Sequence, residues 1–110
     1  MNWLKKIVSP APSTTTSSWD KDALIIDVRS AGEFAAGHVD GALNLPLDRF
    51  AQNHAQVAPD KAKQIILYCL SGARSGQAMQ FLMQQGYLNV VNGGSASAVA
   101  LRTTRPIRRH

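Results

Sequence analysis

The clearest structural signal in this chain is Gln64-Ile65-Ile66-Leu67-Tyr68-Cys69-Leu70-Ser71-Gly72-Ala73-Arg74-Ser75. Its first half is a continuous apolar run, which is typical of a strand buried on both faces of a sheet. Its second half is a run of small residues that leads into a helical pattern over 75–85, and Gly86 ends that helix. The stretch therefore predicts a strand, a tight turn and a helix, with the one cysteine of the chain, Cys69, at the end of the strand.

Similar signals occur on both sides of this stretch. The apolar run 23–28 predicts a first strand, and Ser30-Ala31-Gly32-Glu33 is a capping box that begins a short helix ending at Gly37. The other expected elements are a brief strand at 42–46, a helix at 47–57, a strand at 89–91, a turn at 92–94 and a helix at 96–103. Strands that alternate with helices through short connections indicate an α/β fold with a mostly parallel central sheet flanked by helices.

Composition divides the chain into one domain with a segment on either side. The 110 residues suit a single domain, and a hydrophobic content of 45% argues against disorder over most of the chain. Residues 1–18 include a stretch rich in proline, serine and threonine, so we expect a flexible N-terminal segment there. We expect the domain at 19–104 and a basic C-terminal tail at 105–110.

The net charge of +5 raises the question of a nucleic-acid partner. Residues 21–100 carry equal numbers of acidic and basic side chains, so the excess lies outside that range. Most of it comes from Arg102, Arg105, Arg108 and Arg109, which could contact RNA, DNA or anionic lipid by simple electrostatics. No aromatic residues are interleaved with these arginines to stack on bases. We therefore expect a solvated, poorly ordered tail and no nucleic-acid partner.

The sequence shows neither a membrane span nor a secretion signal. No apolar run approaches the roughly 18 residues that a span needs. The start carries lysines but lacks the apolar stretch of about 7–15 residues found in signal peptides. One cysteine cannot form an intramolecular disulfide, which agrees with a reducing compartment. We expect a cytoplasmic protein, with the periplasm as the alternative if the start is processed or truncated.

The loop after Cys69 has the composition of an anion-binding turn. Ser71, Gly72 and Ala73 are small enough for backbone N–H groups to point inward beside the first amides of the helix. Arg74 adds a permanent positive charge, and such a field lowers the pKa of a thiol. A lone cysteine is often an inert buried hydrophobe. These neighbours instead predict a reactive thiolate that attacks an anionic substrate without a general base.

Two separate motifs follow each other along the chain. The first comprises Leu24–Arg29 with Glu33-Phe34, Gly37–Ala42 and Asn44-Leu45-Pro46, and the second comprises Cys69–Ser75 with Gly86-Tyr87 and Val90–Gly94. In this order the motifs resemble the two signatures of the rhodanese family, and residues 22–94 carry the resemblance. The short single-domain members, of the phage-shock-protein-E type, are the most similar. The resemblance implies a small three-layer α/β fold with a mostly parallel sheet.

The resemblance also implies a sulfurtransferase that moves the sulfane sulfur of thiosulfate, or of a related donor, to a thiophilic acceptor. Cys69 would carry the sulfur as a persulfide, and the acceptor would be cyanide in assays or a small thiol or protein thiol in cells. Arg74 would attract the anionic end of the donor, and no metal or organic cofactor is implied. The substrate-binding residues would be Leu70, Ser71, Gly72, Ala73, Arg74 and Ser75. The resemblance departs at Leu70, because the family often has a charged or polar residue just after the cysteine.

Two other functions are compatible with a cysteine in such a loop. Cysteine-dependent phosphatases and arsenate reductases use similar loop physics, but they usually place one more residue between cysteine and arginine than the four found here. A smaller ring suits a persulfide or thiosulfate better than a phosphate ester. The alternative from a different class is a rhodanese-like binding module without catalysis, which acts through its surface or its basic tail. A cysteine retained in a favourable loop argues against that alternative.

The other conspicuous residues favour structural roles. Asp27 and Arg29 at a strand end predict a buried ion pair, and the spacing of Arg29 and Glu33 permits a local pair. His38 is expected to fix a turn by hydrogen bonding, and His54 is expected at the edge of the core. Three histidines and one cysteine show no zinc-ligand spacing, so we expect no metal site.

Overall fold

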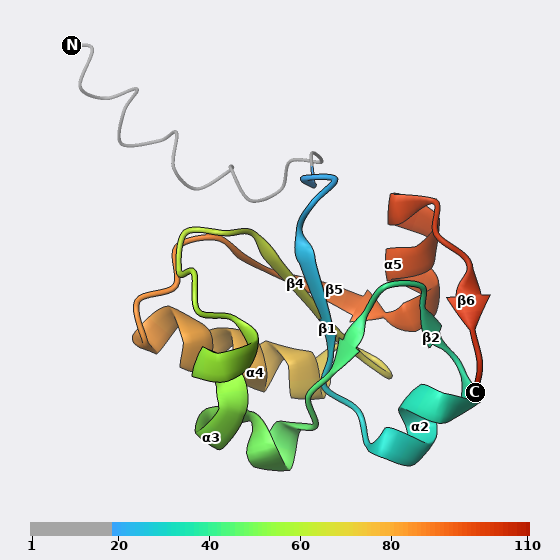
Figure 1. Cartoon of the computed structure of the whole chain (residues 1–110), viewed down its shortest axis with the longest axis horizontal. Coiled ribbons are helices and arrows are strands. Elements are labelled where there is room, and N and C mark those ends of the chain that lie inside the picture. Colours follow the sequence, from blue (N-terminus) through green and yellow to red (C-terminus); the bar gives the residue numbers. More distant parts are fainter. Residues whose placement is uncertain (1–18) are drawn as a thin grey trace, which may run out of the picture.

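Four parallel strands form the central sheet of the computed structural model, which describes residues 19–110 (Figure 1). In spatial order the strands are β3 (Leu43–Asn44), β1 (Leu24–Asp27), β4 (Ile65–Cys69) and β5 (Val90–Ser95), and every neighbouring pair is parallel. The predicted α/β class with a mostly parallel sheet is confirmed. The flexible segment expected at 1–18 lies outside the described residues.

Side chains of β4 point alternately into two hydrophobic clusters, one on each face of the sheet. The odd-numbered residues of β4 pack in the cluster that α3 (Leu47–Val57) and α4 (Ala73–Gln84) cover. The even-numbered residues pack in the cluster that includes α5 (Ala96–Thr103). Figure 1 shows α3 and α4 on one side of the sheet and α5 on the other, so the fold has three layers. Burial on both faces explains the unbroken apolar run of β4.

The helices begin and end close to the residues that the sequence predicts. The capping box at Ser30 forms and starts α2 (Ala31–Ala36), which Gly37 ends. The bounds of α3 and α5 agree with the predicted 47–57 and 96–103, whereas α4 begins at Ala73, two residues before the predicted start. No helix within residues 19–110 is both long enough and apolar enough to span a bilayer.

The turn predicted at 92–94 is wrong, because β5 continues through these residues to Ser95. Leu67 pairs with Asn92 and Tyr68 pairs with Gly94, which leaves Gly93 as the extra residue of a bulge. Gly93 lacks a side chain for a packing reason, since a Cβ there would lie 2.5 Å from Cγ2 of Val99 in α5. Gly93 therefore marks a close approach of α5 to the sheet.

Residues 106–110 are exposed to solvent, as expected from their charge, but they do not form the poorly ordered tail that we expected. Strand β6 (Ile107–Arg108) pairs antiparallel with β2 (His38–Val39), and Figure 1 shows the C-terminus beside α2. The ring of His110 packs edge-on against that of His38, with 4.9 Å between the ring centroids. The expectation of a poorly ordered tail failed because charge alone does not report the backbone pairing that an edge strand offers.

Two of the tail arginines also have partners on the turn after β2. The guanidinium of Arg105 donates to the backbone carbonyl of Asp40 at 2.9 Å, and Nε of Arg108 lies 3.1 Å from Oδ1 of Asp40. These arginines are thus tied to the fold by residues more than 60 positions earlier in the chain.

Candidate active site

Cys69 lies at the carboxyl end of the central strand β4, where parallel α/β sheets bind their ligands. Helix α4 begins only four positions later, so the connection is a tight loop. Gly72 makes this possible because it adopts a φ of +104°, a left-handed conformation that favours glycine. The strand, loop and helix predicted from the sequence are therefore all present around the thiol.

Three donors from the loop and the first turn of α4 converge on the sulfur of Cys69. The N–H of Gly72 donates to Sγ at 3.0 Å, and the N–H and hydroxyl of Ser75 both lie 3.4 Å from Sγ. The side of α4 that faces the sulfur is its N-terminus, which carries partial positive charge. Cys69 is 1% exposed and forms no disulfide. The arrangement stabilises negative charge on a nearly covered sulfur.

The pKa of the Cys69 thiol is the result of opposing effects. Burial raises this pKa, while hydrogen bonds from the Ser75 hydroxyl and from the N–H groups of Ser75, Gly72 and Ser71 lower it, and the outcome is about 7. The sequence led us to expect the N–H groups of the loop, the N-terminus of the helix and the charge of Arg74 to lower this pKa together. The main contributors are neutral donors that point directly at the sulfur, which include the expected loop N–H groups. The lowered pKa is therefore confirmed, and Arg74 is not among its leading causes.

Arg74 is occupied by a partner that the sequence did not indicate. Its guanidinium forms a two-point ion pair with Glu33 of α2, with Nη1–Oε1 at 2.9 Å and Nη2–Oε2 at 3.1 Å. These hydrogen bonds, together with one from the backbone of Ser30, lower the pKa of Glu33 to about 2. The pair that the spacing of Arg29 and Glu33 permits does not form. The formal positive charge of the loop is therefore balanced by a carboxylate.

Asn92 is a second site residue that the sequence did not single out. Its Oδ1 accepts hydrogen bonds from the Ser75 hydroxyl at 2.7 Å and from the N–H of Gly94 at 3.1 Å. Its Nδ2 donates to the carbonyl of Gly72 at 3.0 Å. Asn92 thereby joins the bulge of β5 to Gly72 and Ser75, the two residues that donate hydrogen bonds to Cys69.

The side chains of the loop differ in how far they are exposed to solvent. Leu70 is 65% exposed and presents an apolar side chain to solvent directly after Cys69. We call the solvent-facing side of the loop, with the exposed side chain of Leu70 and the partly exposed side chain of Arg74, its mouth. Ser75 is fully buried, and the side chain of Arg74 is about one-third exposed. All six residues expected to bind a substrate, Leu70, Ser71, Gly72, Ala73, Arg74 and Ser75, do follow Cys69 around this turn.

Asp27 and Arg29 form the buried ion pair expected from the sequence. Nη2 of Arg29 lies 2.7 Å from Oδ2 of Asp27, which is completely buried. The same Nη2 donates to the carbonyl of Gly37 at 2.6 Å. The pair therefore fastens the end of β1 to the end of α2, and thus sets where Glu33 stands.

His38 and His54 have the structural roles expected for them. Nδ1 of His38 is 2.8 Å from the carbonyl of Phe34, and the two rings stack with centroids 3.7 Å apart. The ring of His54 packs at the core edge against the rings of Phe81 and Tyr87.

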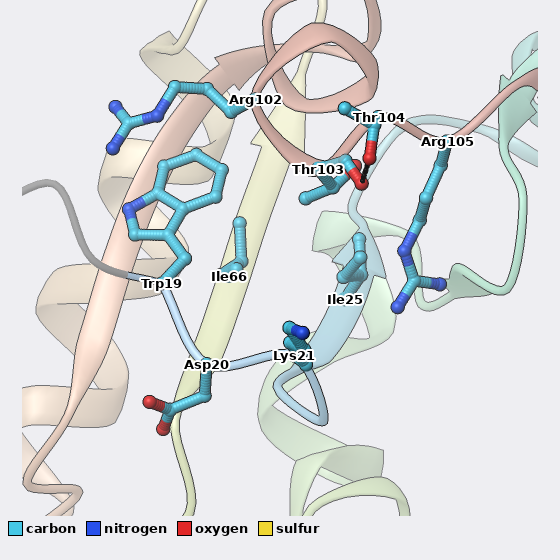
Figure 2. A pocket seen from close by; sticks show the side chains of 9 residues that line it. All are labelled: Trp19, Asp20, Lys21, Ile25, Ile66, Arg102, Thr103, Thr104 and Arg105. Atoms are coloured by element: carbon cyan, nitrogen blue, oxygen red, sulfur yellow. Dashed lines mark hydrogen bonds between the residues drawn. The ribbon is translucent and has the colours of Figure 1, made fainter.

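A separate cavity of about 430 Å³ lies between the residues around Trp19 and the C-terminal end of α5 (Figure 2). Its floor is formed by Ile25 and Ile66, and the guanidinium of Arg102 stands 4.2 Å from the ring centroid of Trp19 at its edge. The remaining lining residues are Asp20, Lys21, Thr103, Thr104 and Arg105. The cavity thus shares no residue with the Cys69 loop.

A thiol at the end of a central parallel strand, held by the N–H groups of a tight loop, places this chain among α/β proteins with a cysteine at the ligand-binding edge of the sheet. Residues 14–98 match the family model of the rhodanese-like domain. The chain therefore belongs to the rhodanese-like family, as the two motifs predicted.

Known proteins of similar sequence and structure agree with this assignment. The chain is 38% identical over 76 residues to the thiosulfate sulfurtransferase PspE of Escherichia coli, a match that covers 69% of this chain and 73% of that protein. It is 40% identical over 72 residues to a sulfurtransferase of Allochromatium vinosum, covering 66% of this chain and 65% of that one. A solved structure of a rhodanese with anions from E. coli matches with a TM-score of 0.72 and 34% identity, over 80% of this chain and 99% of that chain.

Similarity within the family extends to proteins with a different activity. A tRNA uridine(34) hydroxylase of Yersinia enterocolitica is 33% identical over 81 residues, but the match covers only 23% of that protein. Similar rhodanese-like domains therefore occur in proteins with different reactions.

Proposed function

We propose that this chain is a sulfurtransferase that carries sulfane sulfur as a persulfide on Cys69. The observation that carries the proposal is the convergence of Gly72 and Ser75 on Sγ, with three donors between 3.0 and 3.4 Å. With a pKa of about 7, roughly half of the thiol is ionised at neutral pH, and the thiolate is the nucleophilic form. The sulfurtransferases among the similar proteins support the same reaction class.

The proposed donor is thiosulfate or a related sulfane-sulfur compound. The thiolate of Cys69 attacks the outer sulfur of the donor, and a new sulfur–sulfur bond forms while the bond to the sulfonate group breaks. Sulfite leaves with the bonding electron pair, and Cys69 is left as a persulfide anion. In the second half-reaction a thiolate or cyanide attacks the outer sulfur, and the electron pair of the breaking bond restores the Cys69 thiolate.

The loop stabilises charge at each stage of this cycle. The N–H groups of Gly72 and Ser75 hold the thiolate before attack, and the remaining backbone from Leu70 to Arg74 surrounds the position of the second sulfur. Preorganised donors of this kind require no reorganisation during the reaction. No step needs a metal or an organic cofactor. Because Cys69 must stay a free thiol, we also propose a reducing compartment, the cytoplasm, as the place of action.

The proposal is tested by intact-mass spectrometry after incubation with thiosulfate. The wild type should gain one sulfur atom, and cyanide should remove it with release of thiocyanate. Cys69→Ser should gain none, and Ser71→Ala, which keeps the backbone N–H, serves as a loop control that still gains sulfur. A wild type that takes up no sulfur but hydrolyses an aryl phosphate would refute sulfur transfer in favour of phosphatase chemistry.

A further inference from the structure

We propose that the mouth of the Cys69 loop selects sulfur donors of low charge with an apolar substituent, and that Glu33 is the residue that sets this selectivity. The inference rests on the proposed sulfur transfer to Cys69 and names the class of donor. It starts from two observations at the mouth of the loop: Arg74 is paired with Glu33, and the side chain of Leu70 is 65% exposed.

Glu33 is held in place from two directions. One oxygen, Oε1, accepts from the N–H of Ser30 at 3.0 Å and from its hydroxyl at 3.1 Å, as part of the capping box of α2. Both carboxylate oxygens also accept from Arg74 of α4, at 2.9 and 3.1 Å. A carboxylate with four hydrogen bonds from two elements is preorganised, so it does not swing away to free Arg74.

The pair of Glu33 and Arg74 changes the charge that an incoming donor meets. Glu33 stays ionised at any physiological pH because its hydrogen bonds favour the charged form. A guanidinium that already holds a carboxylate on its two-pronged face offers little net attraction to another anion. Thiosulfate, a dianion, must either displace Glu33 or bind beside a like charge, and both are unfavourable.

Leu70 supplies the second half of the selectivity. An exposed leucine next to the nucleophile gains from covering its apolar surface with an apolar group of the donor. The donor class that fits both features carries one negative charge and an organic substituent. Benzenethiosulfonate is a suitable probe because its terminal sulfur is transferable. Cys69 thiolate forms a bond to that sulfur, and benzenesulfinate leaves with the electron pair, so charge and atoms balance as they do with thiosulfate.

The test compares single-turnover rates of persulfide formation with thiosulfate and with benzenethiosulfonate, followed by intact mass. Glu33→Gln keeps an oxygen that can accept from Ser30 but removes the negative charge beside Arg74. We expect this variant to take sulfur from thiosulfate at least tenfold faster at low ionic strength, and to shift the ratio of the two rates at least threefold toward thiosulfate. Comparing this ratio between the variant and the wild type cancels the different intrinsic reactivities of the two donors.

Two further variants complete the design. Asp22→Asn makes the same change in net charge near the opposite end of β1, where Asp22 pairs loosely with Lys63 at 3.7 Å, and it should leave the ratio unchanged. Leu70→Asn should lower the rate with benzenethiosulfonate at least threefold more than the rate with thiosulfate. An unchanged ratio in Glu33→Gln, with sulfur still loaded on Cys69, would overturn the role of Glu33 in selectivity, and an unchanged ratio in Leu70→Asn would overturn the preference for an apolar substituent. Failure of every donor to load wild-type Cys69 would instead refute the proposed function.

Discussion

Replacing Ser75 by alanine tests whether neutral donors control the reactivity of Cys69. The Ser75 hydroxyl lies 3.4 Å from Sγ of Cys69 and 2.7 Å from Oδ1 of Asn92, and the residue is fully buried. A hydroxyl carries a single proton, so it can donate to Sγ only while it does not donate to Asn92. We expect Ser75→Ala to raise the pKa of Cys69, because the lost hydrogen bond stabilises the thiolate more than it stabilises the neutral thiol.

The size of the effect follows from these contacts. A hydrogen bond to a charged group contributes roughly 1.5–3 kcal/mol, and competition from Asn92 places this bond near the lower limit. About 1.4 kcal/mol corresponds to about one pKa unit, so the pKa of Cys69 should move from about 7 toward about 8. At pH 7 the thiolate fraction then falls from about one half to about one tenth, and alkylation slows about fivefold. Well above both pKa values the two proteins should react at similar rates.

The measurement is the rate of alkylation by iodoacetamide between about pH 5 and about pH 10, which reports the thiolate fraction. Ser71→Ala is the matched control because it removes a hydroxyl from the same loop but keeps the backbone N–H. An unchanged or lower pKa in Ser75→Ala would refute the role assigned to the hydroxyl. An equal rise in both variants would show that the loop, rather than the Ser75 bond, was altered.

Three further changes test the fold around the site. Asp27→Asn leaves Arg29 buried without its carboxylate, and unfolding in urea should show a loss of about 3–5 kcal/mol; a loss of a few tenths would contradict a buried ion pair. Gly93→Ala places a Cβ 2.5 Å from Cγ2 of Val99 and should cost about 1–3 kcal/mol, whereas Gly32→Ala, with open space around its Cβ, should cost nothing. Deleting 105–110 removes β6 and should lower the thermal midpoint by at least about 4 °C, with sulfur transfer retained below that midpoint. An unchanged midpoint would show that the β2–β6 pairing adds no stability.

Local pattern was sufficient wherever a segment is buried in a regular way. The apolar run of β4 and the helical spacing of apolar residues in α3 predict these elements because the pattern of apolar residues follows directly from which faces of each element are buried. The capping box of α2 is likewise complete within four residues. The position of Cys69 follows directly, since it is simply the last residue of the central strand.

Contacts between segments that are distant in the sequence could not be predicted from local patterns. Glu33 and Arg74 are 41 positions apart, and the helix cap already accounts for Glu33, so no unexplained feature points to its second partner. Asn92 stands before two glycines, a pattern that local rules assign to a turn. Charge alone also fails for 105–110, because the backbone pairing of β6 depends on an open strand edge elsewhere in the chain.

The bulge at Gly93 changes the face of the sheet toward which the later residues of β5 point. Side chains of a strand alternate between faces, so one extra residue reverses which face every later position occupies. Ser95, the N-cap of α5, stands two residues after Gly93. Deleting Gly93 would therefore do more than shorten the chain, since it would present the start of α5 to the opposite face of the sheet. The number of residues between Asn92 and Ser95, odd or even, therefore helps to determine the face of the sheet on which α5 packs.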